Sequence, residues 1–439
     1  MQTNFSLAQL ADPDIKVAEK IIRSCVHCGF CTATCPTYLL LGDELDSPRG
    51  RIYLIKDMLE NDRAATKDVV THIDRCLSCL SCMTTCPSGV HYMHLVDHAR
   101  VHIARTYKRP LRERLLRNLL AAVLPHRKRF RGALTLASLA RPLAPLLALV
   151  PGSAELRSML ALAPRSIPAR SHYEDPQVIS TAAPKRARVA LLTGCAQPVL
   201  RPATNDAAIR YLTRHGVEVV LAKGETCCGA LVHHMGREHE SLAAARRNVD
   251  AWIAEMDGEG LDAILVTASG CGTTIKDYGF MLREDPAYAE KAARVSAAAR
   301  DISEFLIDLP VPPAPANGKI VAYHSACSLQ HGQQVKNAPK DLLKRAGFEV
   351  RDIPEGHICC GSAGTYNMLQ PDLSRRLLDR KVANIEKTRP DFIAAGNIGC
   401  ITQIAQGTGI PILHTIEMLD WAETGTLPDE NGGYAVGAI

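Results

Sequence analysis

The sequence predicts a protein of the α + α/β class, in which a small helical domain precedes two similar α/β domains with parallel sheets. Two observations support this prediction. Eight of the sixteen cysteines lie before residue 90 in two runs of identical spacing, and the other eight lie after residue 190 in two copies of a different pattern. The expected boundaries are 1–108 for the helical domain, 109–186 for a basic helical segment and linker, 187–315 for the first repeat, and 316–439 for the second repeat and the tail.

The first eight cysteines form two runs of the type C-x2-C-x2-C-x3-C-P. The runs comprise Cys25, Cys28, Cys31 and Cys35 before Pro36, and Cys76, Cys79, Cys82 and Cys86 before Pro87. This spacing is typical of bacterial ferredoxins, in which three thiolates of a run bind one [4Fe–4S] cluster and the fourth binds the other cluster. We therefore expect two [4Fe–4S] clusters. Their expected ligands are Cys25, Cys28, Cys31 and Cys86 for cluster 1, and Cys76, Cys79, Cys82 and Cys35 for cluster 2. A structural zinc site is the alternative, but zinc takes two pairs of ligands rather than a triplet with a separate Cys-Pro.

Two helices are expected next to these runs. Ser47 and Pro48 precede apolar residues at helical spacing, so Ser47 is expected to cap a helix that begins at Pro48. The segment 90–107 has helical spacing after the second run. Arg49 and Arg51 could offset the charge of a thiolate-bound cluster, or they could form ion pairs on a solvated face.

Residues 100–131 form a strongly basic segment, with eleven basic residues and one acid, Glu113. Leu111, Leu115 and Leu119 recur between them at helical spacing, which predicts an amphipathic basic helix. Such a helix could meet an anionic membrane face or an acidic partner subunit. It could equally connect the domains and pack against them with a solvated basic face. The sequence leaves both interpretations open.

The last eight cysteines reveal an internal duplication. In each copy a single cysteine is followed after 32 residues by Cys-Cys-Gly, and a further cysteine lies 44 or 41 residues beyond the start of that pair. The copies are Cys195, Cys227, Cys228 and Cys271, and Cys327, Cys359, Cys360 and Cys400. Apolar, β-rich runs alternate with helical segments, which predicts a parallel sheet covered by helices. Ligands in such folds collect beyond the carboxyl ends of the strands, where these cysteines fall.

The role of these eight cysteines stays open between two alternatives. They are candidates for ligands of a further iron–sulfur cluster, or the vicinal pairs are redox thiols that form and break a disulfide. We favour metal ligation, because simple burial of reduced thiols does not explain two vicinal pairs at matching positions. The nearby histidines are expected to pack or hydrogen-bond rather than to ligate: His27, His233, His234, His324 and His357.

Composition and motifs exclude several classes of function. A net charge of +5 and 5% aromatic residues do not indicate nucleic-acid binding. The sequence has no phosphate-binding loop and no dinucleotide-binding glycine motif after a strand, so no catalytic residue is assigned and any flavin is expected on another subunit. The first twenty residues do not read as a secretory signal, and no apolar run approaches the ~20 residues of a membrane span. We therefore expect a cytoplasmic protein whose clustered cysteines hold metal.

The combination of motifs resembles the iron–sulfur subunits of bacterial glycolate oxidase, also called glycolate dehydrogenase. The resemblance covers nearly the whole chain: the two ferredoxin runs, the stretch Ser47-Pro-Arg-Gly-Arg51 and both Cys-Cys-Gly copies. It implies a complex in which flavoprotein subunits carrying FAD oxidise glycolate to glyoxylate. A chain of this family would pass the electrons to a membrane quinone or another acceptor, and could rest on the inner face of the inner membrane.

Other families share part of this combination and supply the alternative functions. They are the iron–sulfur subunits of anaerobic glycerol-3-phosphate dehydrogenase, D-lactate-oxidising proteins and the heterodisulfide reductases. In heterodisulfide reductases each Cys-Cys-Gly domain ends in Cys-x-x-Cys. Here Cys271 is followed by Gly-Thr-Thr and Cys400 by Ile-Thr-Gln. This departure argues against the non-cubane clusters and the thiol/disulfide chemistry of that family.

Overall fold

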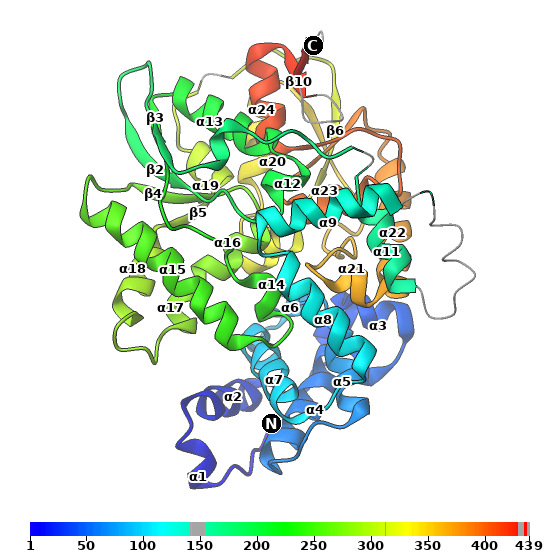
Figure 1. Cartoon of the computed structure of the whole chain (residues 1–439). Helices are drawn as coiled ribbons and strands as arrows, with labels where there is room; N and C mark the ends of the chain where they lie inside the picture. The colour runs from blue at the N-terminus through cyan, green and yellow to red at the C-terminus, as the bar shows by residue number, and fades with distance from the viewer. Residues whose placement is uncertain (141, 143–153, 165, 312, 429–433, 437–439) are drawn as a thin grey trace.

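The computed structural model describes residues 1–140, 142, 154–164, 166–311, 313–428 and 434–436 (Figure 1). A helical N-terminal part is followed by helices of the middle segment and by two α/β units, which confirms the predicted fold class. Parts of the predicted segment 109–186 and of the predicted C-terminal tail lie outside the described residues.

The N-terminal part consists of helices around one apolar core. Its elements are α1 (Leu7–Leu10), α2 (Pro13–Ser24), η1 (Phe30–Thr34), α3 (Pro36–Leu41), η2 (Glu44–Asp46), α4 (Pro48–Glu60), α5 (Lys67–Asp74), α6 (Ser81–Thr85) and α7 (Tyr92–Thr106). Ile22, Ile55 and Leu95 are fully buried in this core. Ser47 Oγ accepts a hydrogen bond from Gly50 N at 3.0 Å, which confirms the predicted cap of α4.

The basic segment forms separate helices where the sequence predicted one. α8 (Leu111–Val123), α9 (Arg127–Ala140) and α11 (Ala154–Leu162) follow α7. Pro110 lies between α7 and α8, and Pro125 lies between α8 and α9. Because proline lacks a backbone N–H and disfavours helix in the residue before it, each proline separates two helices. Several basic side chains bind the chain itself. Arg109 and Arg117 both form ion pairs with Asp74, at 2.6 and 2.9 Å. Packing against the chain's own domains therefore accounts for part of the basic segment.

The first repeat contains a five-stranded sheet of order β1-β3-β2-β4-β5. Its strands are β1 (Gln177–Ile179), β2 (Ala187–Leu191), β3 (Val217–Leu221), β4 (Ala263–Val266) and β5 (Ala299–Asp301). Strands β2 to β5 are parallel, and β1 adds an antiparallel edge to β3. The helices of this repeat are α12 (Gln197–Leu200), α13 (Ala203–Arg214), α14 (Ala230–His233), α15 (Glu238–Asp257), α16 (Ser269–Lys276), α17 (Tyr278–Met281), α18 (Ala289–Ala298) and α19 (Ile302–Leu306).

The second repeat contains a parallel sheet of order β7-β6-β8-β9, which reproduces the order β3-β2-β4-β5 of the first. Its strands are β6 (Ile320–His324), β7 (Glu349–Asp352), β8 (Phe392–Ala395) and β9 (Ile412–His414). Its other elements are η5 (Ser328–Gly332), α20 (Ala338–Arg345), α21 (Tyr366–Leu369), α22 (Pro371–Glu386), α23 (Ile398–Ile404) and α24 (Thr415–Thr424), followed by β10 (Thr426–Pro428) and β11 (Tyr434–Val436). The duplicated sequence therefore folds twice into one topology.

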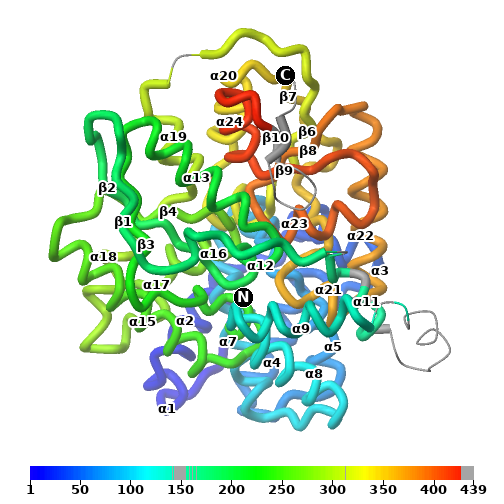
Figure 2. Tube along the Cα trace, turned by 45° about the horizontal axis from the view of Figure 1, so that its top comes forward, coloured from blue at the N-terminus to red at the C-terminus, as the bar shows by residue number. Residues whose placement is uncertain are grey.

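Helices α13 and α24 join the two repeats. Arg201 and Arg210 of the first repeat pair with the buried Glu417 and Asp420 of α24, at 2.7 and 2.6 Å. Figures 1 and 2 show α8, α9 and α11 crossing in front of the junction between both repeats and the N-terminal part. Within the described ranges, we find no helix with the length and apolar character needed to cross a membrane.

The buried His414 predicts a pH dependence of stability. Its Nδ1 accepts from Ile416 N at 3.1 Å to cap α24, and its Nε2 donates to Thr267 O of the first repeat at 2.7 Å. Burial lowers the pKa of His414 to about 4. Because free histidine titrates near 6.5, this stabilisation is complete above about pH 6.5 and is lost as the pH falls towards 4.

Chemical denaturation at pH 7 and pH 5 measures this effect. The wild type should lose about 2 kcal/mol more stability over this interval than His414→Asn, which keeps a capping side chain but does not titrate. An equal loss in both proteins would contradict the assignment.

Candidate functional site

The first predicted cysteine set surrounds one cavity of the N-terminal part. Cys25, Cys28, Cys31 and Cys86 all line it. Arg49, from α4, forms part of the wall and pairs with Glu44 at 2.7 Å. Cys28 is exposed and Cys31 and Cys86 are half-buried, so this cavity lies close to the surface.

The second set surrounds a neighbouring cavity in the interior. Cys35, Cys76, Cys79 and Cys82 line it, and all four are buried. The structure thus brings together the two sets that the spacing predicted, including the exchange of Cys35 and Cys86 between the runs. Cys82 also reaches the first cavity, so the two cavities adjoin.

The two runs share one backbone geometry. His27 and Gly29 in the first run have φ of 57° and 86°, and Ser78 and Leu80 in the second have φ of 50° and 62°. These left-handed residues alternate with the cysteines and turn the chain back on itself. Successive thiols therefore face the same cavity, which is the physical basis of the two-residue spacing.

Arg51 is a buried cation next to the second cysteine set. It is fully buried, with Nη1 3.8 Å from Cys35 Sγ and Nη2 3.2 Å from Asp46 Oδ1. Its Nε donates to His72 O at 2.7 Å. The sequence left open whether Arg51 offsets the charge of a cluster or forms an ion pair on a solvated face. Its burial beside a cysteine sulfur favours the first interpretation. Arg49 shares both roles, since it borders a cavity and makes a partly exposed ion pair.

The donor chemistry of these cavities fits an iron–sulfur group. Burial, together with the neighbouring Cys25 and Cys86 of the same set, raises the pKa of Cys31 to about 11. Burial likewise raises the pKa of Cys79 and Cys82 well above the usual thiol value. Crowded, desolvated thiols ionise when a metal is bound, because the metal supplies the missing positive charge. Thiolates are the ligands that iron–sulfur clusters take.

The cysteines of both repeats lie at the carboxyl ends of strands, as predicted. Cys195 follows β2 and Cys327 follows β6, while Cys271 and Cys400 lie in the helices after β4 and β8. The Cys-Cys pair of each copy lies in the segment that follows β3 or β7. The alternation of strands and helices therefore gathers four thiols at one edge of each sheet.

The glycine of each Cys-Cys-Gly triplet is required by its conformation and by close packing. Gly229 and Gly361 have φ of 86° and 92°, which side chains rarely adopt. A Cβ at Gly361 would lie 2.5 Å from Ser374 O, and one at Gly229 would lie 3.1 Å from Ser241 O. This close approach presses each vicinal pair against a long helix.

All eight cysteines of the repeats line one large cavity of about 570 Å³. Apolar residues of α8, α9 and α11, such as Leu120, Phe130 and Met159, line one side of this cavity. The sequence did not reveal that the two copies share a cavity or that the basic segment covers it. Both facts depend on contacts between segments far apart in the chain.

Within each copy the sulfurs form a chain of neighbours. Hydrogen bonding to Cys227, together with burial, raises the pKa of Cys195, and hydrogen bonds from Cys195 and Cys228 lower that of Cys227. In the second copy Cys327 Sγ lies 3.7 Å from Cys359 Sγ. Both copies therefore present thiols close enough to ligate one group or to form a disulfide.

The second N-terminal set meets the second repeat directly. Cys79 packs in one apolar cluster with Cys327 and Cys359. Thr84 Oγ1 lies 2.7 Å from His331 Nδ1 across the same boundary. The described cysteines thus form a continuous series, from the exposed first set through the buried second set to the large cavity.

The predicted packing role holds for two of the nearby histidines. His233 Nε2 lies 3.2 Å from Asp97 Oδ2, and His234 Nδ1 lies 3.8 Å from Asp97 Oδ1. Burial acts to raise the pKa of Asp97, but the two histidines outweigh it and hold that pKa well below its usual value. His27 Nε2 contacts Met1 Sδ. His324 differs from these histidines, because one of its ring nitrogens lies within 4.8 Å of the sulfurs of Cys360 and Cys400.

Comparison with known families agrees with this division of the chain. A 4Fe-4S dicluster domain matches residues 21–90. A cysteine-rich domain matches twice, over residues 189–276 and 321–405. A solved structure of a hypothetical protein from Helicobacter pylori has the same fold, with a TM-score of 0.54 and 10% identity over 97% of this chain and 76% of that chain.

Curated relatives extend over most of the sequence. The glycolate oxidase iron–sulfur subunit of Escherichia coli (strain K12) is 43% identical over 96% of this chain and 99% of its own length. The probable glycolate oxidase iron–sulfur subunit of Bacillus subtilis (strain 168) is 32% identical over 89% and 90%. Lactate utilization protein A of Bacillus licheniformis is 28% identical over 53% of this chain and 99% of its own length. The chain therefore belongs to the family of glycolate oxidase iron–sulfur subunits.

Proposed function

We propose that this chain is the electron-transfer subunit of a flavin-dependent glycolate dehydrogenase. Oxidation of glycolate to glyoxylate releases two electrons and two protons, which the FAD of partner flavoprotein subunits would take up. A membrane quinone that receives both electrons also takes up two protons and becomes a quinol. The observation that carries the proposal is the unbroken series of sixteen cysteines from the surface to a large apolar cavity.

We assign the first eight cysteines as ligands of two [4Fe–4S] clusters. Cys25, Cys28, Cys31 and Cys86 would hold one cluster, and Cys35, Cys76, Cys79 and Cys82 the other, in keeping with the cavities that each set lines. Such clusters supply one-electron chemistry, which is what draining a two-electron flavin requires. Arg51 would stabilise the added negative charge beside Cys35.

We propose that the flavoprotein partner contacts the surface around Cys28. Cys28 is exposed, and its neighbours Val26 and Phe30 are large apolar side chains that are 67% and 61% exposed. Apolar and aromatic side chains of this kind are typical of the centre of protein–protein interfaces. Electrons would therefore arrive at the first set, which is the most exposed of the cysteine groups.

We propose that the acceptor side lies under α8, α9 and α11. Leu119, Leu136 and Leu156 are exposed and also line the cavity that holds the eight cysteines of the repeats. Leu115 and Leu139 extend this apolar face outside the cavity, at 59% and 72% exposure. An apolar face with basic residues along it suits the surface of an anionic membrane, from which a quinone could reach the cavity.

The complex purified with its natural partners tests the proposed function. It should contain FAD-bearing subunits, and glycolate should reduce a soluble dye through it. Reduction by glycerol-3-phosphate or D-lactate, but not by glycolate, would assign the chain to one of the alternative complexes.

Iron content tests the ligand assignment. Cys28→Ser and Cys227→Ser should each lower the iron and sulfide of anaerobically purified protein, in the first case by roughly four per chain. Ser88→Ala, on the wall of the same cavity as Cys28, should leave both unchanged. If Cys227→Ser kept its iron and lost turnover, the vicinal pair would be a redox dithiol. Stoichiometric zinc in the wild type would contradict both cluster assignments.

Vesicle binding tests the acceptor side. The double variant Leu115→Ser/Leu139→Ser should bind anionic phospholipid vesicles at least tenfold more weakly, since burying one leucine contributes about 1.5–3 kcal/mol. It should also reduce quinone in the vesicles more slowly, with reduction of a soluble dye unchanged. Leu7→Ser is the matched control, because Leu7 is 89% exposed and belongs to α1, which lies apart from α8, α9 and α11 (Figures 1 and 2). Equal vesicle binding by all three proteins would contradict the proposed face.

A further inference from the structure

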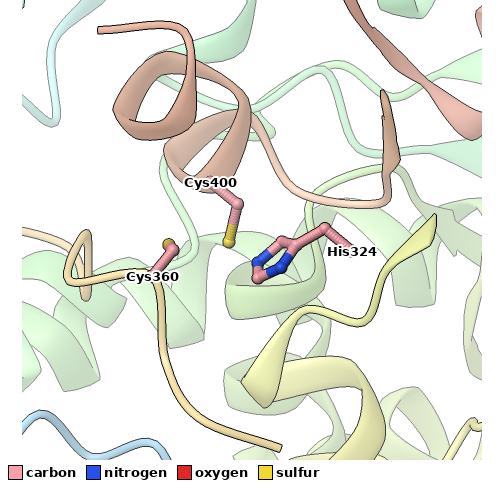
Figure 3. A group of neighbouring side chains, drawn as sticks. All are labelled: His324, Cys360 and Cys400. Atoms are coloured by element: carbon pink, nitrogen blue, oxygen red, sulfur yellow. The ribbon is translucent and has the colours of Figure 1, made fainter. Parts of the chain in front are cut away.

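His324 occupies an unusual environment at the end of β6. Its side chain is 1% exposed, and neither ring nitrogen has a hydrogen-bond partner among the described residues. Leaving a buried polar group unpaired is energetically costly, so such a group needs an explanation. The imidazole is directed towards the sulfurs of Cys360 and Cys400 (Figure 3).

The three side chains are close enough to share one metal. A ring nitrogen of His324 and the Sγ atoms of Cys360 and Cys400 all lie within 4.8 Å of one another. Asn397 Nδ2 donates to Cys400 Sγ at 3.4 Å, and Gly361 N donates to Cys359 Sγ at 3.4 Å. Hydrogen bonds of this kind to sulfur are among the features that tune iron–sulfur centres.

The first repeat lacks this histidine. Three residues before its single cysteine, Cys195, lies Leu192, just as His324 lies three residues before Cys327. Leu192 is buried and packs with Cys228 in an apolar cluster. Where one copy fills the space behind the thiols with an apolar side chain, the other places two unpaired nitrogen atoms there.

A second difference lies on the helix behind each vicinal pair. Ser241 and Ser374 approach the glycines of the two Cys-Cys-Gly triplets. Seven residues later these helices carry Asn248 and Lys381, and both side chains are buried. Lys381 Nζ donates to Glu355 O at 3.1 Å. The helix behind the second vicinal pair therefore carries a buried lysine where the helix of the first copy carries a buried amide.

We propose that His324 binds iron in the second repeat, together with Cys360 and Cys400, so that the two repeats hold unlike centres. This inference rests on the proposed binding of an iron–sulfur group by the repeat cysteines. A neutral nitrogen ligand and a nearby cation both reduce the negative charge of a cluster, and replacing cysteine by histidine raises its reduction potential. The second repeat would therefore be the stronger electron acceptor of the two.

Pulsed electron paramagnetic resonance of the full-length protein tests the proposal. Wild type should show a nitrogen coupling that changes when histidine is labelled with ¹⁵N, in the dithionite-reduced or the ferricyanide-oxidised sample. His324→Leu, which installs the residue of the first repeat, should lose this coupling. His357→Leu, a half-buried histidine of the same repeat, should keep it. Retention of the coupling in His324→Leu, or its absence from wild type in both samples, would overturn the proposal.

His324→Cys keeps the test valid if His324→Leu does not fold. A thiolate at this position should restore iron binding and shift the midpoint potential of this centre to a lower value than in wild type. An unchanged potential would contradict ligation by His324.

The double variant Cys360→Ser/Cys400→Ser separates this inference from the proposed function. If it loses iron while the His324 variants behave as wild type, the second repeat binds a cluster without His324. If it keeps all its iron, the repeat holds no iron and the broader assignment fails as well.

Discussion

The crowding of desolvated thiols is the constraint on which the rest of the structure depends. None of the sixteen cysteines forms a disulfide, and most are buried beside one another. Burial raises the pKa of Cys79 and Cys82 far above the range in which a thiol ionises at neutral pH. A bound cation removes this penalty, because it favours the thiolate form. The left-handed turns, the strand ends and Gly361 are the local means by which the chain keeps such thiols together.

Polar contacts then hold the N-terminal part against the repeats. His94 pairs with Asp277 at 2.9 Å, and the Asp97 carboxylate lies next to the imidazoles of both His233 and His234. These contacts hold the buried cysteine set beside the second repeat, while Cys28 of the other set is exposed. This placement supports the proposed direction of electron flow, from a flavoprotein near the exposed set towards an acceptor at the helices that cover the cavity.

The duplication supplies two copies of one scaffold with different interiors. The sheets have the same strand order, and the thiols occupy the same strand ends. Leu192 and His324 occupy equivalent positions, as do Asn248 and Lys381. A repeated scaffold can change the ligands and the charge around one group of thiols while the other keeps an apolar wall, since each repeat has its own sheet to hold its cysteines.

The sequence by itself determined the fold class, the duplication and the grouping of the first eight cysteines. Spacing was sufficient there, because two-residue intervals and a Cys-Pro dictate which thiols share a turn. It could not determine that the eight later cysteines meet in one cavity, that the basic segment covers this cavity, or that His324 faces sulfur rather than a packing neighbour. Those features depend on how distant segments pack against one another, and the tertiary structure alone brings such segments into contact.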